Sequence, residues 1–562
     1  MDQIKFKVNG AEYAVGCDVS SDVTLLDYLR DRIGLHGTKY MCREGGCGGC
    51  VVSARSPSDA PLAINSCMKS VTSCHGWEIT TIEGLGNRHK GYHPLQKTLA
   101  EKNGSQCGYC SPSWVMAMNS LLQANSDITM LEVEKSLGSQ TCRCTGYRPI
   151  LDAFKSFAKD APRQILLEDI EDLQICKKNG GACEKSDCQE SEWCFVDEDE
   201  GKEDIIEFKL KDDRLWVRAL KVKDIFNILE REGDDSYMLV CGNTAKGVYP
   251  IEEYARVLID ISGVKELKGY TLDQNLIVKS GTTLTEFLEI LKTVAKEQYF
   301  GYLQKIYEHV QKVAHIPLRN VASIAGNLMI KHQNNWFSSD IFLLLEMIGA
   351  QVTIQNRLRA KETLTMQQFL KANMRGAVIW NVMLPPLSDD CRIFTYKVMP
   401  RSENAHAFVN AGFMYKLKSG NTVTNARIVY GALSPSFIRA DATERYLKGK
   451  KLFTNKTLTA AIKILEAELV VEDNPPEPSV EYRKKVALGL FYKGLLSLSP
   501  ETNLVARYKS GATNLADERP VSRAVQVFDT NHTVWPITQP IQKVEAVIQC
   551  EERKKENTFI PP

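Results

Sequence analysis

The sequence lacks the features of an exported or membrane-spanning protein. Its first ten residues, MDQIKFKVNG, contain neither the basic stretch nor the apolar stretch of a signal peptide. The longest apolar run begins at Ile341, is interrupted by Glu346, and is far shorter than the roughly 20 residues that a membrane helix needs. These absences predict a cytoplasmic protein.

An excess of charge of either sign is also missing. The chain has 70 Lys and Arg residues and 69 Asp and Glu residues, which leaves a formal net charge of +1. No long-range field that would attract nucleic acid or an anionic membrane follows from this balance. The 562 residues are 43% hydrophobic and 25% charged, an ordinary globular composition. About three to five domains are expected, at roughly 100–200 residues each.

Cysteine, by contrast, is plentiful. Disulfides are rare in the cytoplasm, so metal binding is the better explanation of the 17 cysteines. The segment KYMCREGGCGGCVV, residues 39–52, has C-x4-C-x2-C spacing, and a further cysteine follows after a short apolar strand. This spacing is typical of plant-type [2Fe–2S] sites, in which four thiolates hold two irons. The predicted ligands are Cys42, Cys47, Cys50 and Cys67.

Glycines in the same loop support the iron–sulfur interpretation. A loop that wraps a cluster must point several N–H groups at the sulfurs and adopt positive φ in places, which Gly45, Gly46, Gly48 and Gly49 allow. Zinc is the competing interpretation, but it usually takes paired C-x2–4-C knuckles with little glycine.

The residues before the loop predict its scaffold. Residues 4–15 alternate apolar and polar around an Asn-Gly turn, which indicates a β-hairpin, and residues 24–34 have helical periodicity. Hairpin, helix and cluster loop together resemble a plant ferredoxin of the β-grasp type.

A second group of four cysteines lies on predicted helical segments. A C-x2-C pair precedes Ser111 and Pro112, which predict a helix start with Ser111 as the N-cap, and a C-x-C pair separates two further helices. Two antiparallel helix pairs that bring these cysteines together would form a second four-thiolate site. On spacing alone, zinc remains an alternative here. The four cysteines are Cys107, Cys110, Cys142 and Cys144.

Three motifs connect the chain to a known family. CREGGCGGC, CGYCSP and CRCTGYRPI resemble the two iron–sulfur domains of the molybdenum hydroxylases, the xanthine dehydrogenase and aldehyde oxidase family. The resemblance continues in order through about residue 549 and implies a [2Fe–2S] cluster at both sites. It matches Gln106 to a glutamine that hydrogen-bonds the molybdopterin, and Cys144 to a ligand whose neighbourhood faces the same cofactor. At one position the sequence differs from the family: Ser113 stands where the family usually has glycine.

Two glycine-containing loops predict a flavin site. An apolar strand breaks into Gly-Asn-Thr at residues 242–244, and a second loop, VASIAGNLM, contains Gly326. A glycine lets the backbone approach a phosphate, and two phosphates need two such cradles. The pair resembles the FAD-binding domain of the same family, which is of the vanillyl-alcohol-oxidase type. The absence of a GxGxxG motif therefore does not count against FAD.

The resemblance also implies which residues contact FAD. Two of them have a simpler interpretation as well, because Asp340 could cap a helix at residues 341–348 and Ile379 is suited to a core. The implied FAD residues are Leu239, Val240, Cys241, Gly242, Asn243, Thr244, Ala245, Lys246, Ser323, Ile324, Ala325, Gly326, Asn327, Asp340, Ile379 and Lys397.

The predicted fold is a multidomain α+β protein. Residues 161–204 are expected to form a polar linker with unligated cysteines, and residues 501–562 an interdomain segment with a divergent tail. The folded units are a β-grasp ferredoxin domain at 1–88, an α-helical [2Fe–2S] domain at 89–160, an α+β FAD-binding domain at 205–389, and an α+β C-terminal flavoprotein subdomain at 390–500.

The loop after Lys397 bears on the electron acceptor. Xanthine dehydrogenases carry adjacent charged residues near the nicotinamide site here, whereas Ser402, Asn404, Ala405 and His406 look more like aldehyde oxidases, which pass electrons from flavin to O2. This favours O2 as acceptor, with a xanthine-dehydrogenase-like, NAD-reducing chain as the alternative. His406 itself is assigned no role.

Single-chain members of the family are more than twice this length, and their remaining half holds the molybdopterin and the catalytic glutamate. This chain is therefore expected to carry electrons through two clusters to FAD, with no catalytic residue of its own for substrate oxidation. Molybdopterin would come from a missing or partner domain. The alternatives are an electron-transfer subunit of a separate molybdenum chain and a non-catalytic interaction protein that binds full-length relatives. A monomer is expected, and no substrate is predicted.

Overall fold

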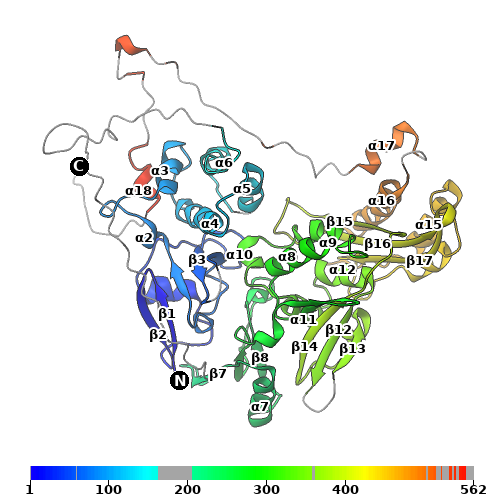
Figure 1. Ribbon diagram of the computed structural model, residues 1–562, viewed down its shortest axis with the longest axis horizontal. Coiled ribbons are helices and arrows are strands. Elements are labelled where there is room, and N and C mark those ends of the chain that lie inside the picture. Colours follow the sequence, from blue (N-terminus) through cyan, green and yellow to red (C-terminus); the bar gives the residue numbers. More distant parts are fainter. Residues whose placement is uncertain are drawn as a thin grey trace.

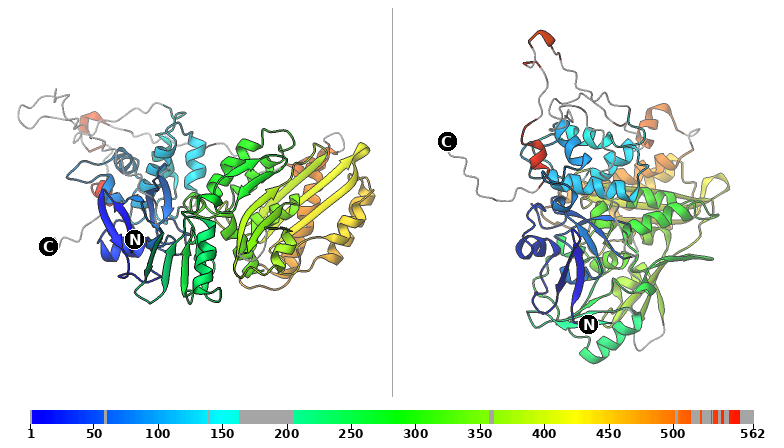
Figure 2. Two further views of the ribbon diagram at one scale, coloured as in Figure 1. Left: turned by 60° about the horizontal axis from the view of Figure 1, so that its bottom comes forward. Right: turned by 60° about the vertical axis from the view of Figure 1, so that its left-hand side comes forward.

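The computed structural model describes residues 2–57, 60–138, 140–162, 205–356, 361–500 and 504–513, together with short pieces between 521 and 551. Apart from residues 161 and 162, the predicted linker lies outside the described residues, as does the end of the predicted tail from residue 552. The two cluster-bearing domains lie together on one flank of the flavin-binding domain, and the C-terminal subdomain lies on its other flank (Figure 1, Figure 2).

The first domain is a five-stranded mixed sheet with the order β2-β1-β5-β3-β4. Its first two strands form the predicted hairpin, whose turn has positive φ at Asn9 and Gly10, as an Asn-Gly turn requires. The helix predicted over residues 24–34 is shorter: α1 (Leu25–Asp27) continues only as a π-helical turn at Tyr28–Arg32. The strands are β1 (Ile4–Val8), β2 (Ala11–Val15), β3 (Val51–Arg55), β4 (Leu62–Asn65) and β5 (Glu78–Thr80).

The second domain is helical, and α3 packs on α6 while α4 packs on α5. The prediction of Ser111 as an N-cap is wrong by one residue. Helix α4 begins at Ser111, Cys110 is its N-cap residue, and the Ser111 hydroxyl donates to Ser105 instead. The helices are α2 (Ile82–Leu85), α3 (Pro94–Glu101), α4 (Ser111–Ala124), α5 (Met130–Leu137) and α6 (Arg148–Lys155).

The flavin-binding domain has two sheets. The first has the order β6-β7-β9-β8, with β7, β9 and β8 parallel and α7 (Val222–Glu232) packed on it through Ile225 and Leu229. Its strands are β6 (Ile206–Lys209), β7 (Leu215–Arg218), β8 (Tyr237–Val240) and β9 (Val257–Asp260).

The second sheet has the order β10-β11-β14-β12-β13, and its helices cover it with a continuous apolar core. The strands are β10 (Tyr270–Leu272), β11 (Leu276–Lys279), β12 (Gln351–Asn356), β13 (Glu362–Thr365) and β14 (Ala377–Leu384). The helices are α8 (Leu284–Val294), α9 (Leu303–Val310), α10 (Ile316–Arg319), α11 (Ile324–Gln333), α12 (Asp340–Ile348) and α13 (Met366–Lys371).

The C-terminal subdomain is an antiparallel three-stranded sheet with helices packed on it, which agrees with the α+β fold predicted for this region. Two small helices of the predicted interdomain segment follow, α17 (Ala506–Ala512) and α18 (Ala546–Gln549). The main elements are β15 (Cys391–Val398), β16 (Val409–Lys418), β17 (Thr422–Gly431), α14 (Asp441–Leu447), α15 (Asn455–Glu468) and α16 (Val480–Leu498).

The ferredoxin-like domain and the first flavin-domain sheet share one core. Val52 and Ile64 of the former lie in the same apolar cluster as Trp216, Val240 and Leu258 of the latter. Burial of a common apolar surface fixes the cluster loop against the flavin domain. Among the described residues, no helix has the length and apolar character needed to cross a membrane.

Candidate cluster and flavin sites

The four cysteines of the first predicted site lie in two pairs. Cys50 Sγ is 3.3 Å from Cys67 Sγ, and Cys42 is hydrogen-bonded to Cys47. This hydrogen bond lowers the pKa of Cys47 to about 5 and raises that of Cys42. A [2Fe–2S] cluster takes two thiolates at each of two irons, so the paired arrangement fits this cofactor.

Backbone amides complete the first site. Glu44 N lies 3.3 Å from Cys42 Sγ, and Gly49 N lies 3.4 Å from Cys47 Sγ. The loop has positive φ at Gly45 and Gly48, where a side chain would be strained. These donors favour the thiolate form, and they stabilise the more negative, reduced state of a bound cluster.

The second predicted site has the same paired design. Cys110 is hydrogen-bonded to Cys142, and Cys107 to Cys144. The first pair is buried and the second exposed. Two thiol pairs fit the two irons of a [2Fe–2S] cluster, as at the first site.

The two cysteine sites lie next to each other. The Thr141 amide donates to the Cys47 carbonyl at 3.0 Å, which joins the first loop to the residue that precedes Cys142. The packing at this junction is tight, because a Cβ at Gly48 would lie 3.1 Å from the side chain of Gln140.

The segment around Gln106, matched above to a molybdopterin contact, is covered by the last described residues. Lys543 donates to the Gln106 carbonyl, and Ser105 Oγ donates to Gln549 Oε1 at 2.9 Å. A Cβ at Gly108 would lie 2.6 Å from the Gln549 side chain. Residues 543–551 of the predicted interdomain segment therefore pack on the second cluster domain.

The structure brings the two predicted FAD loops together. A Cβ at Gly242 would lie 1.9 Å from the Val321 carbonyl oxygen, so only glycine permits this contact. Asn243 has left-handed φ and begins a short 3-10 turn at Thr244–Gly247. Among the described residues, the amides of residues 243–245 have no acceptor. These outward donors fit a phosphate group, which supports the FAD interpretation.

The second loop starts helix α11. Ser323 is its N-cap residue and accepts a hydrogen bond from the Gly326 amide at 3.1 Å. The remaining predicted residues of this loop, 324–327, form the first turn of the helix, where the positive end of the helix dipole favours an anion.

Asp340, Lys397 and Ile379 are all buried. Ile379 is 4% exposed and belongs to the apolar core, as its simpler interpretation predicts. Asp340 does not cap its helix, because Ser339 does. Its carboxylate instead lies 2.8 Å from Lys397 Nζ, and His309 contacts it as well.

Sequence reasoning missed two members of this buried cluster. His309 Nε2 lies 3.2 Å from Asp340 Oδ1, and Asn410 Nδ2 donates to the same oxygen at 2.8 Å. The feature of the sequence that could have indicated His309 is its place on the apolar face of α9. It is the one polar side chain of this helix that is buried. Burial alone would raise the pKa of Asp340, but the Lys397 charge and the hydrogen bonds outweigh it and hold that pKa well below its usual range.

We expect Lys397→Met to lower the unfolding free energy by ~3–5 kcal/mol, because it leaves the Asp340 carboxylate buried without its cation. Addition of Asp340→Asn should recover much of this loss. Since the pKa of Asp340 is depressed, the contribution is present above about pH 4 and is lost as the pH falls below that value.

Denaturant titration at neutral and acidic pH checks this expectation. Lys485→Met is the control, because Lys485 is exposed and pairs with the exposed Glu481, and the unfolding free energy of this variant should stay unchanged. An equal loss in both lysine variants would contradict the role of the buried pair.

The loop at residues 402–406, on which the acceptor prediction rests, contacts both cluster-binding domains. Asn404 Nδ2 donates to the Gly46 carbonyl of the first cluster loop at 3.1 Å. Glu403 lies against Gly138 of the helical domain, and burial raises the pKa of this carboxyl to about 7. His406 contacts Phe337 edge-on, with 5.8 Å between ring centroids.

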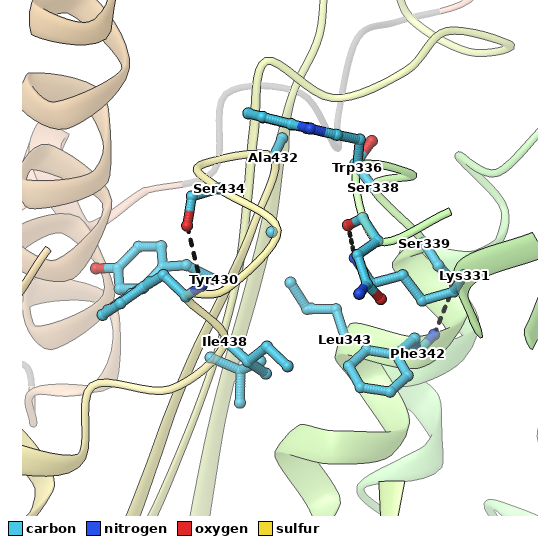
Figure 3. A pocket seen from close by; sticks show the side chains of 14 residues that line it. Lys331, Trp336, Ser338, Ser339, Phe342, Leu343, Tyr430, Ala432, Ser434 and Ile438 are labelled. Atoms are coloured by element: carbon cyan, nitrogen blue, oxygen red, sulfur yellow. Dashed lines mark hydrogen bonds between the residues drawn. The ribbon is translucent and has the colours of Figure 1, made fainter. Parts of the chain in front are cut away.

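A hollow separates the flavin domain from the C-terminal subdomain (Figure 3). Lys331, Trp336 and Leu343 lie on one side, and Ala432, Ser434 and Ile438 lie on the other. Lys331 donates to the Asn335 carbonyl just beyond the end of α11, an ordinary role for a lysine at a helix C-terminus. None of the predicted FAD residues lines this hollow, and we assign it no ligand.

Four protein-family models match the chain in succession. They are the 2Fe-2S iron-sulfur cluster binding domain at residues 6–72, the [2Fe-2S] binding domain at 81–155, the FAD binding domain in molybdopterin dehydrogenase at 207–387, and the CO dehydrogenase flavoprotein C-terminal domain at 394–498. The chain therefore has two cluster-binding domains and one FAD-binding domain.

Curated relatives match almost the whole chain. Indole-3-acetaldehyde oxidase of Arabidopsis thaliana is 32% identical over 97% of this chain and 43% of its own length. Xanthine dehydrogenase of Oryza sativa subsp. japonica is 30% identical over 99% of this chain and 44% of its own length. The chain thus spans less than half the length of these relatives.

Among solved structures, the carbon monoxide dehydrogenase of Hydrogenophaga pseudoflava matches with a TM-score of 0.43 and 18% identity, over 49% of this chain and 93% of that one.

Proposed function

Because the chain belongs to the molybdenum hydroxylase family of aldehyde oxidases and xanthine dehydrogenases, we propose that it forms the electron-transfer portion of an aldehyde-oxidase-like enzyme. When bound, two [2Fe–2S] clusters supply one-electron transfer from a molybdenum site, and FAD supplies two-electron reduction of an acceptor. The molybdenum site lies outside these residues, on a longer form of the protein or on a partner chain.

One observation carries the proposal: the first cysteine loop lies between the second cysteine site and the flavin domain. On one side, the Cys47 carbonyl accepts from Thr141, beside Cys142. On the other side, a Cβ at Gly45 would lie 2.9 Å from the Leu318 side chain of the flavin domain, and Asn404 of the C-terminal subdomain donates to the Gly46 carbonyl. This order supports electron flow from the second site through the first site to FAD.

The first FAD loop also reaches this cysteine site. A Cβ at Gly247 would lie 2.5 Å from the Glu44 carbonyl oxygen. The pKa of Cys67 is lowered mainly by its hydrogen bond with Cys50, and the charge of Lys246 adds to this effect. The same loop that offers amides to FAD thus approaches a predicted cluster ligand, which keeps the transfer distance short.

The proposed acceptor is O2, and the proposed location is the cytoplasm. The acceptor rests on Ser402, Asn404, Ala405 and His406, and its alternative, NAD, rests on the similarity to a xanthine dehydrogenase. Anaerobically reduced protein should be reoxidised by O2 and not by NAD. Reoxidation by NAD would overturn the oxidase assignment.

Metal and flavin analysis of the protein from its native source tests the proposal. About four irons per FAD without molybdenum are expected if these residues act as a separate electron-transfer chain. The same iron content with one molybdenum would mean that a longer chain or a partner completes the enzyme. Fewer irons would refute the assignment of two clusters, and empty cofactor sites without dye reduction would favour a non-catalytic interaction protein.

A further inference from the structure

One buried amide connects the first cysteine site to the flavin domain. Asn65, at the end of β4, is fully buried, and its Oδ1 lies 3.7 Å from Cys50 Sγ. Its Nδ2 lies 3.4 Å from the Gly45 carbonyl oxygen and 2.7 Å from His315 Nε2. A single side chain therefore contacts a predicted cluster ligand, the cluster loop and the flavin domain.

The partner in the flavin domain is a neutral histidine. His315 precedes α10 and is 1% exposed. Burial, with the charges of Arg319 and Arg401 adding to it, lowers the pKa of His315 to about 3. A neutral imidazole has one N–H group, so Nε2 either donates or accepts, and Asn65 must present the complementary atom.

The orientation seen here suits a protonated Cys50. Its thiol proton is within reach of Asn65 Oδ1, and Asn65 Nδ2 faces His315 Nε2, which then accepts. A cluster ligand is a thiolate, which has no proton and only accepts hydrogen bonds. An amide oxygen directed at that sulfur would then be repelled.

Reversal of the amide removes the conflict. Rotation of the Asn65 side-chain amide by half a turn directs Nδ2 at Cys50 Sγ and Oδ1 at His315. The imidazole then donates from Nε2, which its other tautomer allows. The reversal gives up the hydrogen bond from Nδ2 to the Gly45 carbonyl oxygen and turns Oδ1 toward that oxygen. At 3.4 Å this is the weaker of the two contacts of Nδ2.

We infer that Asn65 and His315 are linked positioning residues of the first cluster, in which the flavin-domain histidine holds the asparagine N–H against the Cys50 sulfur. The inference rests on the proposed binding of a cluster by this site. An N–H donor directed at a ligand sulfur stabilises the reduced cluster and raises its reduction potential. Docking of the flavin domain would thereby set the potential of the cluster next to it.

Potentiometric titration of the full chain with its clusters and FAD, followed by electron paramagnetic resonance, tests this inference. Asn65→Leu removes the donor, and His315→Leu removes the group that orients it. Both variants should lower the midpoint potential of the first cluster, Asn65→Leu by more, while the second cluster in the same sample stays unchanged. If Asn65→Leu does not assemble the first cluster, His315→Leu decides the question.

The matched control is Asn320→Leu. Asn320 is also buried and donates across the same interface to the Ala63 carbonyl at 2.8 Å. Its other hydrogen-bond partner among the described residues is Thr285, so neither partner is a predicted ligand. It should leave both potentials unchanged. An unchanged or raised potential in His315→Leu, or an equal fall in Asn320→Leu, would overturn the inference. Absence of the first-cluster signal from the unmodified protein would instead refute the cluster assignment itself.

Discussion

Replacement of Cys50 by serine should remove one of two clusters, so that the iron content falls from about four to about two per chain. Cys50 is 1% exposed and is paired with Cys67 at 3.3 Å, and no other cysteine of the first site is placed to take over its iron. Because the first site lies between the second site and the flavin domain, reduction of FAD through the clusters should also be lost. Iron analysis and electron paramagnetic resonance measure the effect.

Two further variants make this result specific. Cys110→Ser should remove the other cluster and leave the signal of the first, because Cys110 belongs to the second site. Cys17→Ser is the control, since Cys17 is exposed and lies outside both sites, and it should retain all the iron. Full iron content in Cys50→Ser would refute the predicted ligand set.

The second large effect is expected at Gly242. Alanine there would place its Cβ 1.9 Å from the Val321 carbonyl oxygen, so the two predicted FAD loops must separate. Such overpacking costs ~1–3 kcal/mol or more in a well-packed region. If this free energy destabilises the loop conformation that binds FAD, the affinity for FAD drops by about tenfold for each ~1.4 kcal/mol. Flavin fluorescence titration of the flavin-depleted protein measures the change.

Gly301→Ala is the matched control for this substitution. A Cβ at Gly301 meets no atom within 4 Å, so the change alters only the backbone preference. FAD affinity should stay within about twofold of the original, since this is well below the tenfold expected from ~1.4 kcal/mol. If both variants bind FAD as tightly as the original protein does, the contact between Gly242 and Val321 does not support FAD binding.

Short-range patterns predicted the first cluster, and the family resemblance that they carry implied the second cluster, FAD and the fold class. The spacing of the cysteines around Gly45 and Gly48 indicated a cluster loop, because ligand chemistry and backbone conformation both act over a few residues. The α+β character of the C-terminal subdomain followed from the family resemblance. The N-cap predicted at Ser111 was wrong, because the Ser111 hydroxyl donates to Ser105 instead of capping α4.

Long-range contacts were not predictable in this way. Asp340 finds its partners 31 residues away at His309 and 70 residues away at Asn410, and no spacing rule connects them. The contact between Asn65 and His315 spans 250 residues. Such pairs depend on which apolar surfaces bury each other, and that packing is a property of the whole chain.

The sequence by itself determined the first cluster loop and, through its resemblance to a known family, the other cofactors and the order of the domains, because cluster ligands and phosphate cradles need particular residues at short separations. Only the tertiary structure decided which cysteine site lies against the flavin domain and how the eight thiols pair. It also decided that Asp340 and Lys397 neutralise each other in the interior. The position of the first site follows from the shared burial of Val52, Trp216 and Val240, which sets the cluster loop on the flavin domain.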